Sequence, residues 1–162
     1  MTTDKIIKGA KFSEDGKYRY GLHRIWNNSK PKVLFILLNP STADSLENDK
    51  TIGKCVKYAK DWGYGGIYVS NIFAYKSVNS SDLLNVENPY GEDNDYYRLE
   101  MADKSSLIVC AWGNSDIIKK LKPNLDFSSI KKPLHVLDLS KDGTPKQPLY
   151  LKSNLKPQFY KA

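Results

Sequence analysis

Asparagine, proline, serine, threonine and aspartate follow one another directly after an apolar run of this sequence. The run covers Val33–Leu38 and leads into Asn39, Pro40, Ser41, Thr42, Ala43 and Asp44. Proline fixes one backbone angle, and the two hydroxyls with nearby backbone amides would form a cradle for an oxyanion or a phosphate. The segment lacks the glycines of a P-loop. A strand-to-helix turn with a serine or aspartate cap is therefore the alternative interpretation.

Three further apolar runs also end in polar, loop-forming clusters. They cover Ile67–Tyr75, Leu107–Trp112 and Leu134–Leu139. Short runs of this composition, separated by helical patterns, predict parallel strands. Ligands of open α/β sheets bind in the crevice beyond the carboxyl ends of such strands. The four endings therefore predict one shared ligand site.

Several side chains at these endings could recognise a ligand, and each also has a structural alternative. Asn71 lies inside an apolar run, so it either satisfies a neighbouring loop or reads the edge of a base or sugar. Phe73 either packs in the core or stacks on a ligand. Trp112, followed by Gly113 and Asn114, either presents its indole face to a ligand or covers the core.

A tight turn follows the last of the four runs and carries a lysine on each side. Lys141 precedes the turn and Lys146 follows it. Two lysines in this position would neutralise phosphate groups. A solvated surface turn is the alternative.

Residue types that commonly perform catalysis are sparse. His23 and His135 are the only histidines, and His135 lies within an apolar run. No spacing of cysteine and histidine matches a metal site, and no Gly-x-Ser-x-Gly elbow occurs. Aspartates could act as acid or base, but the pattern singles none out. The residues predict a binding protein without catalytic residues, metal or cofactor.

The elements that must position these residues follow from periodicity. Lys17–Trp26 is typical of a strand, and Thr51–Trp62 has helical spacing with Asp49 or Thr51 as its N-cap. Shorter helices are expected over residues 80–84, 93–103 and 116–121. Alternating strands and helices predict a three-layer α/β fold with a mainly parallel central sheet and an antiparallel N-terminal strand at one edge.

Composition sets the class of protein and of partner. The 162 residues predict one domain over 1–162, with an extended, proline-containing tail from about 143 to 162 that packs along the surface or against another subunit. The net charge of +7 favours anionic partners, and eleven tyrosines suit base stacking as well as a core. No apolar run approaches the roughly 20 residues of a membrane span. Two cysteines and no signal-peptide pattern favour the cytoplasm.

The sequence resembles a bacterial and phage family catalogued as domain of unknown function 1643. Linked motifs in order carry the resemblance from about residue 18 to 151. They are Tyr18-Arg19-Tyr20, Leu37–Asp44, Asp49-x-Thr51-Ile52-x-x-Cys55, Trp62–Gly66, Asn71–Ala74, Gly91-x-x-Asn94-Asp95, Ala111–Gly113 and Lys141-Asp142-Gly143-x-Pro145-x-x-Pro148–Leu151.

The resemblance has two competing implications. One is a topology and an activity similar to uracil-DNA glycosylases, in which a histidine stabilises charge on the excised base. Where the family commonly has that histidine before Pro-Leu-Tyr, this sequence has Gln147. The other implication is similarity to phage anti-CBASS sponges, which sequester cyclic dinucleotide signals of bacterial immunity in the host cytoplasm without turning them over.

The sponge hypothesis assigns a role to each group of side chains, in a site closed by a homo-oligomer. Ser41, Thr42 and Lys141 or Lys146 would contact phosphates. Asn39, Asn71 and Asn114 would read polar edges. Trp112, Phe73 or Tyr150 would stack on bases, and Tyr18 with Arg19 would close the pocket. Pro40, Asp44 and Gly113 complete the expected site. An enzyme using Asn39 and Asp44, and a general nucleic-acid binder driven by charge, are the alternatives.

Overall fold

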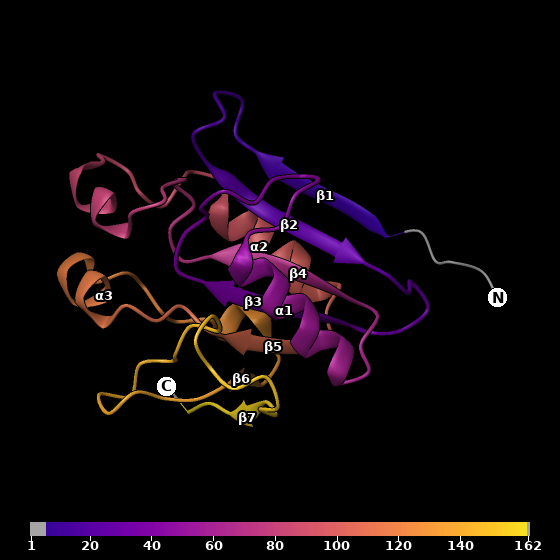
Figure 1. Ribbon diagram of the computed structural model, residues 1–162. Helices are drawn as coiled ribbons and strands as arrows, with labels where there is room; N and C mark the ends of the chain where they lie inside the picture. The colour runs from indigo at the N-terminus through magenta and orange to yellow at the C-terminus, as the bar shows by residue number, and fades with distance from the viewer. Residues whose placement is uncertain (1–5, 162) are drawn as a thin grey trace.

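The computed structural model describes residues 6–161, which contain one mixed β-sheet with helices on both faces (Figure 1). The sheet has seven strands within these residues, in the order β1-β2-β4-β3-β5-β6-β7. They are β1 (Ile7–Phe12), β2 (Arg19–Ile25), β3 (Lys32–Leu37), β4 (Gly66–Asn71), β5 (Leu107–Cys110), β6 (Leu134–Val136) and β7 (Gln158–Phe159).

The sheet is parallel only at its centre, where β4, β3, β5 and β6 run in the same direction. The strands β1 and β2 form an antiparallel hairpin that joins β4 antiparallel, and β7 pairs antiparallel with β6. The predicted α/β class is correct, whereas the prediction of a mainly parallel sheet is corrected to a mixed one. A hairpin and a returning tail need no crossover helix, and so they add antiparallel strands at both edges.

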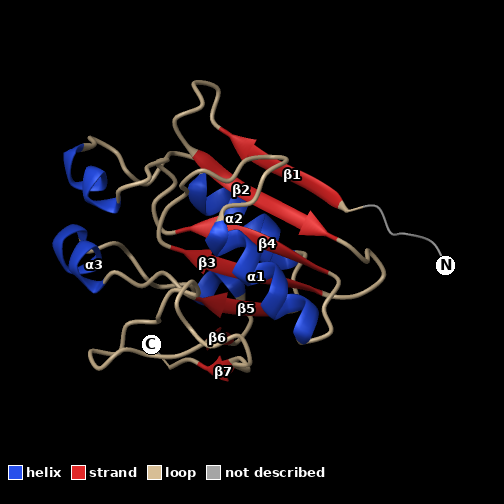
Figure 2. Ribbon diagram, in the orientation of Figure 1, coloured by secondary structure: helices blue, strands red, loops and turns tan. Residues whose placement is uncertain are grey.

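Alternating side chains of the central strands divide the core into two halves. Val33, Phe35 and Val69 face the helix α1 (Lys50–Asp61), while Leu34 and Ile36 face α2 (Asn94–Asp103). The two helices therefore cover opposite faces of the sheet, as Figure 2 shows. Both faces of the central strands are buried, which is why these strands are continuous apolar runs.

The helix α1 begins where the sequence predicted. Of the two predicted caps, Asp49 is the N-cap, and its side chain accepts a hydrogen bond from the backbone N–H of Ile52 at 2.9 Å. Among residues 6–161, no helix is both long enough and apolar enough to cross a lipid bilayer.

Short helical turns lie beyond the carboxyl ends of the central strands. The 3₁₀ turn η1 (Ser80–Asn85) follows β4, and α3 (Ser115–Leu121) follows β5 (Figure 1). A second 3₁₀ turn, η2 (Ser128–Ile130), precedes β6 and packs near α2. The loops that carry η1 and α3 form the surroundings of the candidate site.

The C-terminal tail packs along α1. The indole Nε1 of Trp62 donates to Leu155 O at 2.9 Å, and the hydroxyl of Tyr58 donates to Lys152 O. The tail then returns to the sheet as β7. It thereby ties the helix α1 to the edge of the sheet.

Candidate functional site

A crevice lies beyond the carboxyl ends of β3 and β5. Across the sheet, the four parallel strands lie in the order β4-β3-β5-β6. The first of them in the chain, β3, therefore lies between the second, β4, and the third, β5. The chain moves from β3 to β4 on one side and then crosses to β5 on the other, so the strand order reverses between β3 and β5. This switch point is where open α/β sheets bind ligands.

The switch-point crevice encloses about 460 Å³, within the range of small-molecule sites. Its walls are formed by the loop after β3, the segment after β5 and the returning segment around residue 148. Arg19 of β2, the start of α1 and the start of η1 complete them. The lining residues include Arg19, Asn39, Ser41, Asp49, Thr51, Ser80, Trp112, Asn114, Gln147, Pro148 and Tyr150.

Arg19 reaches this crevice because β2 is irregular. The pairing of β1 with β2 shifts register between Lys11 and Phe12, so that Tyr20 lacks an opposite residue. Tyr20 stacks on Tyr97 of α2, while Arg19 bonds to groups on the α1 side. A β-bulge re-aims side chains in this way. Without it, regular alternation would place Arg19 on the α2 face.

The Arg19 guanidinium is a buried cation whose hydrogen bonds go to uncharged oxygens. It is 1% exposed and donates to Ala43 O at 3.1 Å and to Asn71 Oδ1 at 3.3 Å. Its Nε has no partner among residues 6–161. Burial lowers the pKa of Arg19 to about 10, and the nearby Asp49 carboxylate opposes this shift. The group is thus still charged at neutral pH and has a free donor.

A second buried arginine holds residues 44–48 of the loop after β3, which do not line the crevice. Arg24 donates to Asn48 Oδ1 at 2.7 Å and to Glu47 O at 3.1 Å, and it also binds Asp44 O. Arg24 does not line the crevice. Its role is to fix residues 44–48 against β2.

The returning segment is held close to the end of β5 by a glycine. Gly113 has φ = 60°, and a Cβ on it would lie 3.0 Å from Cβ of Gln147. The Gly113 N–H donates to Pro145 O at 2.8 Å. Only glycine allows this approach without strain, and it brings Gln147 to the crevice.

A second hollow of about 530 Å³ adjoins the crevice. The two hollows share Asn114, Gln147 and Tyr150. Tyr150 is 88% exposed, so its ring is open to solvent at the rim. We call the crevice and this hollow together the two-lobed site.

A family model matches most of the chain. It is described as "Protein of unknown function (DUF1643)" and covers residues 19–149. The chain belongs to this family. No curated protein and no solved structure matches the chain significantly. The matched range contains every residue of the two-lobed site except those after Leu149.

The two-lobed site brings together eight of the residues expected from the sequence. Arg19, Asn39, Ser41, Trp112, Asn114 and Tyr150 line the crevice, and Gly113 and Lys146 line the adjoining hollow. Asn39 also fixes its own loop, because its Nδ2 donates to Ser77 O at 3.0 Å. Lys146 lies 3.4 Å from the Asp138 carboxylate, which offsets part of its charge.

Two aromatic residues differ from the expected stacking role. Phe73 is fully buried and packs against Tyr90 with ring centroids 5.1 Å apart, so it offers no face to a ligand. Trp112 is 2% exposed, and its indole packs against Phe127 on the α2 side. The core interpretation is therefore correct for both rings, although Trp112 still forms part of the crevice wall.

The remaining expected residues lie outside the two-lobed site. Asn71 is buried and accepts from Arg19, so it positions that guanidinium. Asp44 caps its own turn by accepting from Leu46 N at 2.9 Å and Glu47 N at 2.8 Å. Tyr18 faces the α2 side, and Pro40 is buried. Thr42 and Lys141 are exposed, and neither residue lines a hollow.

Sequence reasoning did not assign Thr51, Ser80 or Pro148 to the site, and it considered Asp49 as a helix cap and as one of several possible acids or bases. Three of these residues lie at the start of a helix or helical turn, or directly before one. Polar residues there are usually explained by capping. The signal that could have identified them is that each of these helices follows a predicted strand end.

Proposed function

We propose that the two-lobed site binds a nucleotide with phosphate groups, and that the chain sequesters a cyclic dinucleotide without turning it over. The buried Arg19 guanidinium carries this proposal. Among residues 6–161, no carboxylate is in hydrogen-bond contact with this guanidinium, and a desolvated cation with a free donor is unfavourable on its own. An anionic group of the ligand would supply the missing partner.

The shape of the site supports a ligand with two similar halves. Two hollows of about 460 and 530 Å³ meet at Asn114, Gln147 and Tyr150. Each half of a cyclic dinucleotide would occupy one hollow, and Tyr150 at the rim would stack on a base. The Oε1 of Gln147 accepts from Leu149 N at 2.8 Å, which leaves its Nε2 to donate to the ligand.

Sequestration requires tight binding without reaction. Both histidines lie elsewhere: His23 packs near Tyr68, and His135 packs on Phe159. Gln147 stands at the position where the family commonly has a histidine, and an amide donates a hydrogen bond without titrating. A phage protein of this kind would block CBASS-type defence in the host cytoplasm. A homo-oligomer would close the open rim and slow dissociation.

A second candidate is base excision on a topology similar to that of uracil-DNA glycosylases. Asp49 favours it, because its carboxylate lies on the wall of the same crevice as Asn39. In that case Asp49, rather than the expected Asp44, would act as the base for an attacking water.

Analysis of released ligand separates the two candidates. The protein is incubated with cyclic dinucleotides and denatured, and the supernatant is examined by chromatography. Stoichiometric recovery of intact ligand is expected. A converted product would overturn sequestration, and loss of uracil from DNA without any dinucleotide binding would favour excision. Binding of DNA that weakens steeply with salt, with no small ligand bound, would indicate a general nucleic-acid binder.

A further inference from the structure

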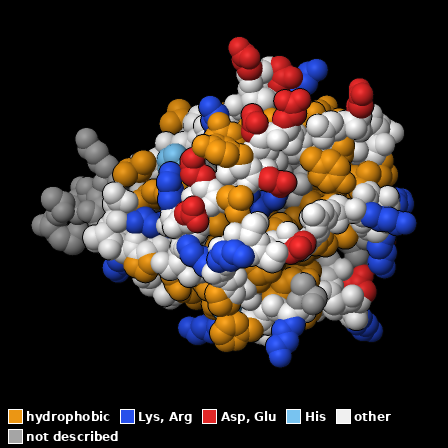
Figure 3. Space-filling model, turned by 180° about the vertical axis from the view of Figure 1, so that it is seen from behind, with side chains coloured by type: hydrophobic (Ala, Val, Ile, Leu, Met, Phe, Trp, Pro, Cys, Tyr) orange, Lys and Arg blue, Asp and Glu red, His pale blue; other side chains and the backbone are white. Residues whose placement is uncertain are grey.

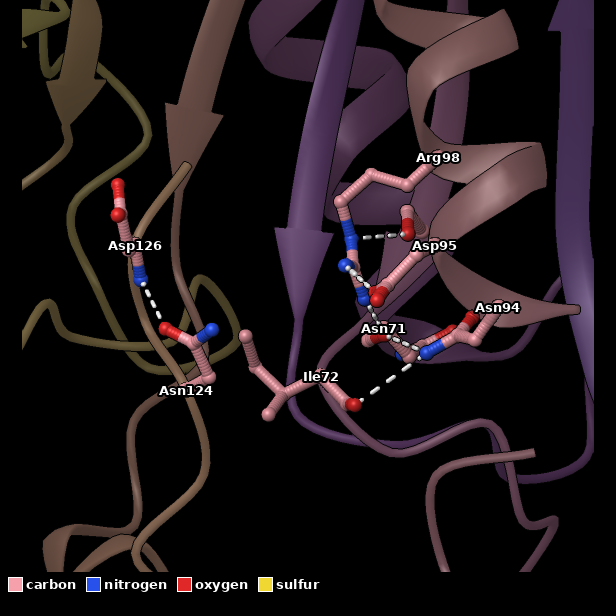
Figure 4. Close-up of polar contacts among 8 residues, drawn as sticks. Asn71, Ile72, Asn94, Asp95, Arg98, Asn124 and Asp126 are labelled. Atoms are coloured by element: carbon pink, nitrogen blue, oxygen red, sulfur yellow. Dashed lines mark hydrogen bonds and ion pairs between the residues drawn. The ribbon is translucent and has the colours of Figure 1, made fainter. Parts of the chain in front are cut away.

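A separate cavity lies on the opposite side of the sheet, between α2 and the segment 123–130. It encloses about 460 Å³ and is lined by residues of both, together with Ile72 and Tyr90. Figure 4 shows Arg98 and Asp95 on one side, Asn124 and Asp126 on the other, and Ile72 between them. Figure 3 views this face and shows acidic and apolar side chains next to one another. We call it the α2 cavity.

The charges around the α2 cavity disfavour an anion. Arg98 is the cation of its lining, and the ion pair at 2.8 Å with the exposed Asp95 offsets part of its charge. Asp126 adds a further negative charge. Hydrogen bonds from Ser128 lower the pKa of Asp126, so it is ionised at neutral pH. A phosphate placed here would face excess negative charge.

The same cavity also disfavours a compact cation. The Arg98 side chain is 9% exposed, and its guanidinium donates to Ser70 Oγ at 3.0 Å and to Asn71 O at 2.7 Å. These bonds fix its positive charge at the inner wall, where it would repel an ammonium group. The charges around the α2 cavity therefore favour a neutral ligand.

The walls favour a ligand with hydrogen-bond donors and a flat apolar body. The Nδ2 of Asn94 donates to the carbonyls of Asn71 and Ile72, at 2.8 and 3.3 Å, which fixes the orientation of the amide. Its Oδ1 is buried and has no donor among residues 6–161. Tyr90, 37% exposed, and Ile130 add apolar surface. Acceptors beside aromatic and aliphatic walls suit an amino-substituted ring.

We propose that the α2 cavity is a second binding site, which takes a neutral planar heterocycle bearing N–H donors, of nucleobase or nucleoside type. It differs from the two-lobed site because its buried cation, Arg98, is paired with a carboxylate. The two sites therefore select opposite ligand classes: phosphate-bearing at the switch point, and phosphate-free at α2.

Isothermal titration calorimetry with the full chain tests this site, using adenosine, AMP and putrescine as probes. Adenosine is expected to bind, AMP to bind at least tenfold more weakly, and putrescine not to bind. Tyr90→Leu is expected to weaken the binding of adenosine at least fivefold. Asp126→Asn is expected to retain the binding of adenosine and to reduce the difference in affinity between adenosine and AMP. Asp103→Asn, which makes the same charge change on an exposed residue outside the cavity, is the matched control.

Two further measurements keep this proposal distinct from the proposed function. Arg19→Lys should leave adenosine binding unchanged, and Tyr90→Leu should leave binding of a cyclic dinucleotide unchanged. Absence of adenosine binding at millimolar concentration, equal affinity for AMP, or loss of adenosine binding in Arg19→Lys would each overturn the second site. None of these outcomes bears on whether the two-lobed site binds a cyclic dinucleotide.

Discussion

Two buried arginines of β2 lie on the same face of the sheet but have different surroundings. Arg19 and Arg24 are each 1% exposed. Arg24 binds several oxygens of the loop 44–48 and is structural, whereas Arg19 lines the crevice and keeps a free Nε. At the scale of the residue, the neighbours decide whether a buried cation uses its donors to hold the fold or keeps one of them free.

This contrast gives a matched pair of variants. Arg19→Lys is expected to weaken cyclic dinucleotide binding about 10- to 100-fold, because a hydrogen bond to a charged group contributes about 1.5–3 kcal/mol. Arg24→Lys is expected to lower the melting temperature while retaining the affinity of the folded protein. Titration calorimetry and thermal unfolding measure both. Equal affinities in wild type and Arg19→Lys would contradict the role of Arg19.

The two cysteines are expected to be chemically inert in the folded protein. Burial raises the pKa of the Cys110 thiol to about 12 and also raises that of Cys55. The thiolate is the reactive species, so both groups remain unreactive at pH 8. A colorimetric thiol reagent should label neither cysteine in the native protein and both after denaturation. Rapid labelling of the native protein would show that one of them is accessible.

At the scale of the element, the turn Ser140–Thr144 shows how a short polar segment stabilises itself. Asp142 accepts from Ser140 Oγ at 2.5 Å and from Thr144 N at 3.0 Å. Gly143 has φ = 83°, which the turn requires. The turn directs the chain from β6 back toward the end of β5. It therefore determines where Gln147 and Tyr150 enter the site.

The pH dependence of this turn follows from Asp142. Its hydrogen bonds hold the pKa of Asp142 well below its usual range. A depressed carboxyl pKa contributes stability above the unfolded value of about 3.9, and this stability is lost as pH falls through the folded pKa. Asp142→Asn should thus be less stable than wild type at pH 7, with the difference shrinking below about pH 4. Chemical denaturation at pH 7 and pH 3 tests this. A constant difference would contradict it.

At the scale of the whole molecule, the C-terminal tail connects the two-lobed site to α1. Gln147, Pro148 and Tyr150 line the site, and residues further along the tail bind Tyr58 and Trp62 of the α1 region. The helix, the tail and the rim of the site therefore support one another. A change far from the crevice can alter it through this connection.

Removal of residues 151–162 should reveal this dependence. The hydrogen bonds from Tyr58 and Trp62 to the tail contribute about 0.5–1.5 kcal/mol each, and burial of Leu151 and Leu155 adds to them. We expect a lower melting temperature and weaker dinucleotide binding. Lys152→Ala is the control, because it retains the backbone carbonyl that accepts from Tyr58. An unchanged affinity in the truncated protein would show that the rim is held without the tail.

Local patterns predicted much of the fold. The apolar runs at 33–38 and 107–112 became β3 and β5, and the 3.6-residue spacing after Asp49 became α1. The strand predicted from the apolar run Ile67–Tyr75 was too long, because β4 ends at Asn71. Ile72 and Phe73 still donate to the carbonyls that end β3, but the chain then turns away from the sheet. An apolar run indicates that its residues are buried, but it does not distinguish a buried strand from a buried loop that follows the strand.

The sequence by itself determined the α/β class and the family resemblance, and it predicted a ligand site at the ends of the central strands, because periodicity and polar strand endings are local properties. Only the tertiary structure decided which side chains meet there. It placed Phe73 in the core, assigned Asn71 to hold Arg19, and brought Asp49 and Thr51 to the crevice wall. The physical reason is that a one-residue bulge in β2 and the burial of each group depend on contacts between distant segments.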